Sequence, residues 1–228
     1  MIIPLEAAIF LFYPDITYFM GRTAKLALSS YIPMEDMMLL RQSFLQSTIY
    51  LLDLPGKYPS PLFSFLFFCF AFLSIYLVPR IKLYKPLGLW LVFLSGINIL
   101  SSVLFMLLPS MFPYTMLKFS ELYITTEVGM WFFVPVIMGI ALLPIPAGIF
   151  SKFVILFLTL LYSMIFGIVR YIVFLFIIAK LSYLFMPVLY FSLGPLVDFI
   201  YIVGIYSFYV SKVAENIAQD CKVWKWVF

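Results

Sequence analysis

The sequence has no histidine and few cysteines or charged residues. Its 228 residues include two cysteines and no histidine, and only 11% of them are charged. Without histidine, the chain has no imidazole to act as a general base or as a ligand for haem or zinc. The two cysteines, Cys69 and Cys221, are too far apart for the short spacings of a metal site or for an evident disulfide framework. We therefore expect no metal and no cofactor.

What the sequence has instead is apolar side chains. Hydrophobic residues make up 65% of the chain and aromatic residues 21%, whereas soluble domains contain about 45–50% apolar and 25% charged residues. This composition indicates an integral membrane protein. The net charge of +4 is spread over several loops, so it indicates orientation in a lipid bilayer and not binding to nucleic acid.

Five apolar runs predict helices that cross the membrane, since a bilayer core needs about 20 apolar residues in a helix. The fold class that we expect is an all-α, polytopic transmembrane helix bundle of five spans, or six if residues 1–60 contain another. The predicted spans are residues 61–78, 87–108, 128–143, 153–179 and 183–210. Residues 61–212 would form the bundle.

Residues 1–60 read as an N-terminal amphipathic region at the membrane surface. Glu6 and Asp15 bracket an apolar run that is too short to span. Apolar residues then recur at near-helical spacing from residue 37 to residue 53, after a predicted helix start near Pro33. This pattern predicts an amphipathic helix that lies on the membrane or packs against the bundle.

Basic residues in the loops predict the orientation. With five spans, one side would hold seven of them and the other side only Lys118 and Lys180. Because basic loops stay in the cytoplasm, the side with seven is expected there, with residues 213–228 as a cytoplasmic tail. The seven are Arg80, Lys82, Lys85, Lys152, Lys212, Lys222 and Lys225.

The most informative residue is Arg170, which lies inside the fourth predicted span. A charge near mid-membrane costs about 2.5–3.5 kcal/mol on insertion scales, so this side chain should face protein and have a partner. The candidate acids are Glu127, at the predicted start of the third span, and Asp198 in the fifth. Tyr190 would supply a hydroxyl at a similar depth. These residues are either a structural ion pair that fixes the register of the helices or a functional polar cluster.

Ser95 and Asn98 lie on one face of the second predicted span. Such residues in a membrane helix usually form hydrogen bonds to a neighbouring helix, worth about 0.6–2 kcal/mol. We expect both to be interhelical polar contacts.

Three short motifs within residues 121–212 resemble those of the exosortase and archaeosortase family. Members are polytopic membrane proteins proposed to be cysteine transpeptidases that process C-terminal sorting tails of exported proteins. Their motifs are Cys-Ser-Gly, Asn-x-x-Arg, and a His or Arg, in exosortases shortly before a Gly. Here these places read Glu127-Val128-Gly129, Gly167-Ile168-Val169-Arg170, and Tyr190 to Gly194. Only the arginine and two glycines match.

The resemblance implies that Glu127 stands in place of the catalytic cysteine and Tyr190 in place of the histidine. It also implies a prokaryotic plasma membrane. Thiol chemistry is then lost at this site, because neither cysteine of the chain falls in these motifs.

Three functions remain open. The one we favour is a non-catalytic, exosortase-like subunit of a larger membrane assembly, for export or surface anchoring of a protein or polymer. Its partners would be other membrane proteins and the lipid bilayer. The second is a transpeptidase or peptidase with an atypical site of Glu127, Arg170 and Tyr190. The third is an ion or solute transporter subunit with Arg170 and Asp198 on the ion path.

Overall fold

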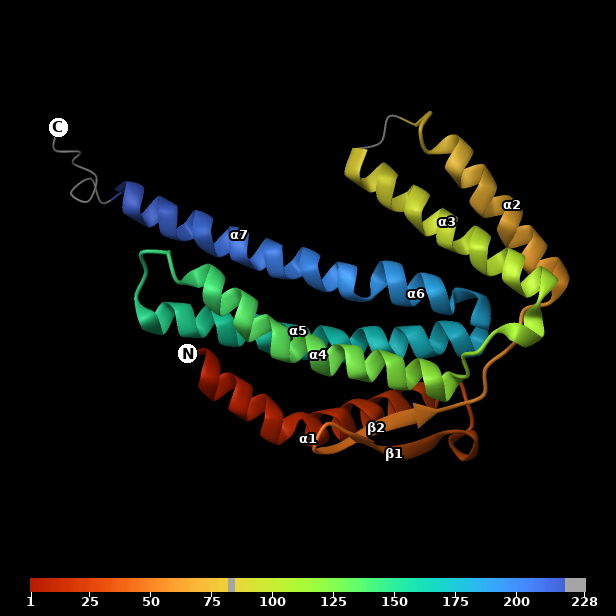
Figure 1. Cartoon of the computed structure of the whole chain (residues 1–228), viewed down its shortest axis with the longest axis horizontal. Coiled ribbons are helices and arrows are strands. Elements are labelled where there is room, and N and C mark those ends of the chain that lie inside the picture. Colours follow the sequence, from red (N-terminus) through yellow and green to blue (C-terminus); the bar gives the residue numbers. More distant parts are fainter. Residues whose placement is uncertain (82–84, 220–228) are drawn as a thin grey trace.

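The protein is a bundle of long helices with a small β-hairpin packed along one side (Figure 1). The computed structural model describes residues 1–81 and 85–219. The α-helices are α1 (Ile2–Leu28), α2 (Pro61–Leu77), α3 (Lys85–Leu107), α4 (Met116–Leu142), α5 (Ile149–Lys180), α6 (Met186–Leu193) and α7 (Pro195–Gln219). The strands are β1 (Met38–Phe44) and β2 (Ser47–Asp53). Short 3-10 turns are η1 (Met34–Asp36), η2 (Pro109–Met111) and η3 (Tyr183–Phe185).

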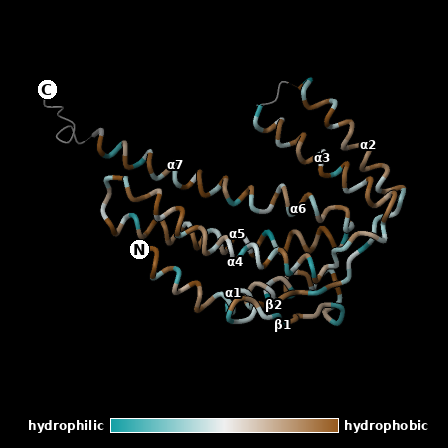
Figure 2. The backbone as a smooth tube through the Cα atoms, in the orientation of Figure 1, coloured by the Kyte–Doolittle hydropathy of each residue, from teal (hydrophilic) through white to brown (hydrophobic). Residues whose placement is uncertain are grey.

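The predicted fold class, a helical transmembrane bundle, is confirmed. Within the described residues, five helical stretches are long and apolar enough to cross a membrane, namely α1, α3, α4, α5 and the segment Tyr183–Ile217, which contains α6 and α7. Helix α2 is apolar but shorter. Apolar residues dominate these helices along their length (Figure 2).

Helix α1 corrects the prediction that Glu6 and Asp15 confine a run too short to span. The helix continues past both acids to Leu28, and Asp15 is exposed. Its buried residues recur every three to four positions and face the bundle, so the exposed residues Asp15 and Arg22 fit on the other sides of the same helix. The buried residues are Leu5, Ile9, Tyr13, Thr17, Met20, Gly21, Ala24 and Leu28.

Residues 38–53 form a β-hairpin, and the predicted amphipathic helix over residues 37–53 is wrong. The strands pair antiparallel, from Met38 opposite Asp53 to Phe44 opposite Ser47. Ile49 and Leu51 are buried on alternate positions of β2, which is the two-residue period of a strand. Apolar residues spaced three to four apart had concealed this shorter period.

Side chains from the bundle satisfy the free edge of β2. The Leu52 N–H donates to Tyr171 Oη (3.2 Å), Tyr171 Oη donates to Ser120 Oγ (3.0 Å), and Ser120 Oγ donates to the Leu52 carbonyl (2.6 Å). Tyr171 and Ser120 lie on α5 and α4 and are fully buried. The closed ring joins the hairpin to both helices and leaves neither polar group of Leu52 unpaired.

Removing one hydroxyl from this ring should destabilise the fold. The substitution Tyr171→Phe leaves the buried Leu52 N–H without an acceptor, which costs about 1–3 kcal/mol. The measurement is the unfolding midpoint in mixed micelles of mild and denaturing detergent. Tyr162→Phe on the same helix is the matched control, because Tyr162 is exposed and its hydroxyl forms no hydrogen bond to any residue that the structure describes. Equal midpoints for the two variants would contradict the role of the ring.

The last predicted span, residues 183–210, is divided in two. Helix α6 ends at Leu193 and α7 begins at Pro195. Proline has no backbone N–H and cannot continue the hydrogen bonding of the preceding helix, so the chain breaks at Gly194. Helix α7 then runs to Gln219, beyond the predicted end at residue 210 and into the predicted tail. The remainder of that tail, with Cys221, lies outside the described residues.

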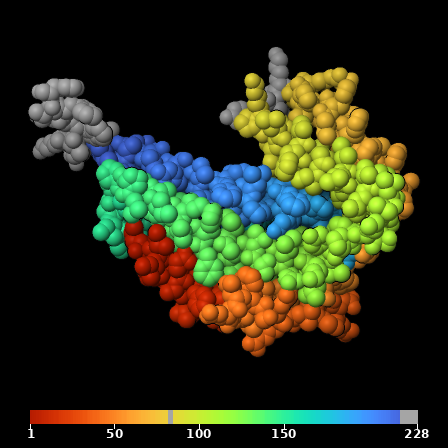
Figure 3. All heavy atoms as spheres, viewed as in Figure 1, coloured from red at the N-terminus to blue at the C-terminus, as the bar shows by residue number. Residues whose placement is uncertain are grey.

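Helices α2 and α3 form a hairpin that stands away from α7 and leaves an opening between them (Figures 1 and 3). The hairpin joins the bundle through contacts of α3 with α6 and η3. At that junction lies an apolar cavity of about 330 Å³, lined among others by Ile97, Leu100 and Leu104 of α3 and Phe191 of α6.

Candidate functional site

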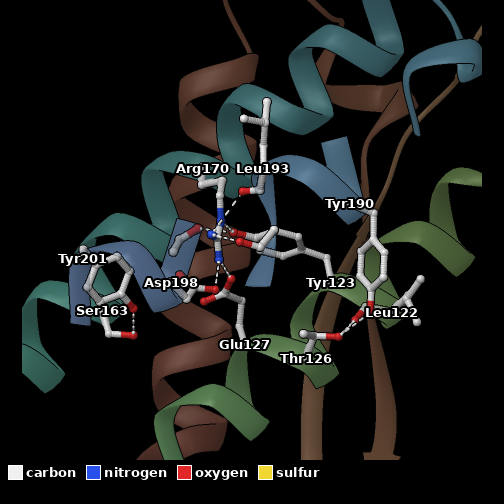
Figure 4. Close-up of polar contacts among 12 residues, drawn as sticks. Leu122, Tyr123, Thr126, Glu127, Ser163, Arg170, Tyr190, Leu193, Asp198 and Tyr201 are labelled. Atoms are coloured by element: carbon white, nitrogen blue, oxygen red, sulfur yellow. Dashed lines mark hydrogen bonds and ion pairs between the residues drawn. The ribbon is translucent and has the colours of Figure 1, made fainter. Parts of the chain in front are cut away.

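Arg170 lies on the buried face of α5 and is 5% exposed. It is ten residues before the end of the helix at Lys180, which corresponds to about 15 Å along the axis. Helices α4 and α7 and the break after α6 surround its side chain (Figure 4). The guanidinium is therefore buried on this apolar helix, as the sequence predicted.

All five N–H donors of the guanidinium are used within the chain. Nε donates to Tyr123 Oη at 2.8 Å. Nη1 donates to the carbonyls of Leu193 and Gly194 at 3.2 and 3.0 Å. Nη2 donates to Glu127 Oε1 and, at 2.9 Å, to Asp198 Oδ2. Arg170 therefore has no donor left for a substrate.

Both candidate acids pair with Arg170, where the sequence had left a choice between them. Glu127 and Asp198 are each 1% exposed. Glu127 lies inside α4, about three turns after its start at Met116, and not at the start of a span, because α4 begins earlier than the predicted residue 128. Asp198 lies in the first turn of α7. The three side chains join α4, α5 and α7.

The break between α6 and α7 contributes backbone atoms to the site. A helix that ends leaves carbonyls without intrahelical partners, and here those of Leu193 and Gly194 accept from Arg170 Nη1. Asp198 follows in the first turn of the next helix, where the partial positive charge of the helix N-terminus favours an anion. One guanidinium thus donates hydrogen bonds to the carbonyls at the end of α6 and to the Asp198 carboxylate of α7.

Gly167 provides the space for the Glu127 side chain. A Cβ atom on this glycine would lie 2.5 Å from Glu127 Oε2, closer than van der Waals contact allows. The carboxylate therefore sits directly against the α5 backbone, one turn before Arg170. The same Oε2 atom is buried and has no hydrogen-bond partner within the described residues.

Tyr123 is a member of the site that the sequence did not single out. Its hydroxyl accepts from Arg170 Nε and donates to the Gly167 carbonyl at 3.0 Å, and the residue is 2% exposed. Among 16 tyrosines nothing marked this one. Its position one turn before Glu127 on the same face of α4 is the signal that could have found it.

Tyr190 does not join Arg170. Its hydroxyl pairs with Thr126 Oγ1 at 2.9 Å, on the far side of Tyr123 in Figure 4. It also lines a small apolar pocket together with Leu122 and Phe119. Of the three motif positions that resemble the exosortase pattern, the structure brings together Glu127 and Arg170 and leaves Tyr190 apart.

The hydrogen bond that joins α3 to another element does not come from Ser95 or Asn98, as predicted, but from a different residue of the same helix. Ser95 donates to the Leu91 carbonyl of its own helix at 2.8 Å, and Asn98 Oδ1 is buried with no partner among the described residues. The contact between elements comes from Ser101, which donates to the Leu184 carbonyl of η3 at 2.8 Å. The α3 face that contains Ser95 and Asn98 therefore makes no side-chain hydrogen bond to another helix within the described residues.

The chemistry that this site can perform by itself is limited. Arg170 stays charged and cannot donate a proton, and the site contains no thiol, since Cys69 is exposed on α2. Within residues 1–81 and 85–219, no group of three or more acidic or cysteine side chains is placed to hold a metal ion.

In comparisons with known proteins, no family model, no curated protein and no solved structure matches the chain.

Proposed function

We propose that the chain is a non-catalytic, exosortase-like membrane subunit, in which the former catalytic position works as a clamp between helices. The observation that carries the proposal is the complete use of the Arg170 donors by Tyr123, Glu127, Asp198 and two backbone carbonyls. An arginine that is saturated within its own chain cannot also hold an anionic substrate. Glu127 replaces the nucleophilic thiol expected from the resemblance, so the acyl transfer of the family has no nucleophile of its usual kind.

The assembly with other membrane proteins is supported by the opening between the α2–α3 hairpin and α7. Leu100 of α3 is 72% exposed and Phe191 of α6 is 60% exposed, and both border the apolar cavity at the base of this opening. Leu100 and Ile97, with Phe93 and Leu104, recur every three to four residues along one face of α3. This is the spacing with which one membrane helix packs against another. A partner helix seated here would support the export or anchoring of a protein or polymer through the larger assembly.

The test is purification of the full chain from its own membranes in mild detergent, followed by mass spectrometry. We expect one or more membrane proteins in fixed stoichiometry. Leu100→Trp should release them, because the larger ring occupies the opening. Leu62→Trp on α2 is the matched control: Leu62 is also 72% exposed and lies outside the cavity. A chain that purifies alone, or partners that both variants retain, would contradict the proposal.

A second candidate, a subunit of an ion transporter, is favoured by one specific observation. The break at Gly194 directs two carbonyls into a buried site with charged residues, and helices broken near charged residues are typical of transporter sites. Ion flux into liposomes that contain only the purified chain would support it, and flux equal to that of empty liposomes would exclude it for the chain alone.

A further inference from the structure

The charges of the buried site do not balance. Arg170 contributes one positive charge, whereas Glu127 and Asp198 together contribute two negative charges, so the site is formally −1 when both acids are ionised. The titratable neighbours from the packed elements are Tyr123 on α4 and Tyr201 on α7, which donates to Ser163. Neither supplies a positive charge, and no second cation pairs with these acids in the described part of the chain. Burying an uncompensated charge away from water costs free energy and destabilises the fold.

The two acids are not equally placed to hold the surplus negative charge. Asp198 lies in the first turn of α7, where the helix dipole favours its ionised form. Glu127 lies in the interior of α4, about three turns after its start, so the N-terminus of its own helix does not favour its negative charge. Its Oε2 is buried, unpartnered and pressed against Gly167. Arg170 cannot donate a hydrogen bond to this oxygen, because all five of its N–H groups already donate to other acceptors.

We propose that Glu127 binds one exchangeable proton at Oε2, which makes the site neutral. The proton comes from water and forms an O–H bond on the carboxylate, and its release restores the carboxylate with no other bond broken. Glu127 Oε1 remains an acceptor from Arg170 in either state. Since the same side chain joins α4 to α5, loss of the proton leaves an unbalanced charge at this contact and weakens the attachment of α4.

The test is infrared difference spectroscopy of the full chain in lipid vesicles, recorded over a pH series in water and in heavy water. We expect a carbonyl-stretch band of a buried protonated carboxylic acid that shifts in heavy water and disappears reversibly as the pH rises. Glu127→Gln should remove the band at every pH. Asp198→Asn removes the surplus negative charge, so the band should persist only at more acidic pH. Glu121→Gln, a partly exposed acid paired with Lys118, should leave the band unchanged.

The amide bands of the same spectra report whether each variant is folded. If Glu127→Gln does not fold, the comparison of Asp198→Asn with Glu121→Gln decides. The proposal is overturned if the native protein lacks the band or if the band survives in Glu127→Gln. It is also overturned if Asp198→Asn has no effect, or if the signal follows sodium concentration at constant pH. The proposal does not rest on the subunit function, because a chain that purifies alone could still show the band.

Discussion

Replacing Arg170 with methionine is expected to destabilise the protein by about 3–5 kcal/mol, the largest effect that we predict. Methionine fills a similar volume but leaves Glu127 and Asp198 buried together with no positive charge between them. It also leaves Tyr123 and two carbonyls without their donor. The measurement is the free energy of unfolding from a titration with denaturing detergent, followed by circular dichroism.

The matched comparison removes the whole set of charges. A triple variant with Arg170→Met, Glu127→Gln and Asp198→Asn has no buried charge left, so it should be more stable than Arg170→Met alone. Lys118→Met, which removes an exposed cation with a surface partner, should cost no more than about 1 kcal/mol. If Arg170→Met were as stable as the triple variant, the three side chains would not act as one network.

Gly167→Ala is expected to destabilise the protein by about 1–3 kcal/mol, although alanine is the better helix former. The added methyl group would lie 2.5 Å from Glu127 Oε2 and 3.2 Å from its carboxyl carbon. The glutamate must then move away from α5, and its ion pair with Arg170 must lengthen. The same detergent titration measures the effect, and the infrared band assigned to Glu127 should shift with it.

Gly129→Ala is the control for this substitution. Gly129 is also inside a helix, and a Cβ atom there would meet no atom within 4 Å. Alanine at this position should therefore stabilise the protein by about 0.5–1 kcal/mol through helix propensity alone. Opposite signs for the two variants support the close contact at Gly167, and the same sign for both would refute it.

The long helices could be predicted from the sequence because a membrane-spanning helix needs only a long apolar run. Helices α3, α4, α5 and the segment that contains α6 and α7 each overlap a predicted span. Helix α1 was missed because that rule also treats charges as breaks, whereas α1 continues through Glu6 and Asp15 and carries Asp15 on an exposed side. The division at Gly194 was missed because Gly-Pro within an apolar run does not interrupt hydropathy.

The centre of the site could be predicted by one physical argument, and its surroundings could not. A buried arginine needs an acid, and the sequence offers only Glu127 and Asp198 within the later spans. Which backbone carbonyls and which tyrosine complete its five bonds depends on how α6 and α7 break and pack. That information lies in the arrangement of the helices and not in any local pattern.

The hairpin could not be predicted because its strands are stabilised mainly by packing against helices, and the sequence does not show that packing. A single two-stranded hairpin is only marginally stable by itself, and this one owes its stability to contacts with α1 and α4. Residues 47–53 nevertheless contain the β-branched and aromatic residues Thr48, Ile49 and Tyr50, which favour strands.

The ring of Leu52, Ser120 and Tyr171 has a consequence for the order of assembly. A chain is synthesised from its N-terminus, and Leu52 precedes Ser120 by 68 residues and Tyr171 by 119. Contacts between such distant residues must await the synthesis of both partners, and closing long loops slows folding. The contacts of β2 with α1, which precedes it in the chain, can form early, whereas its attachment to α4 and α5 must await the synthesis of residue 171.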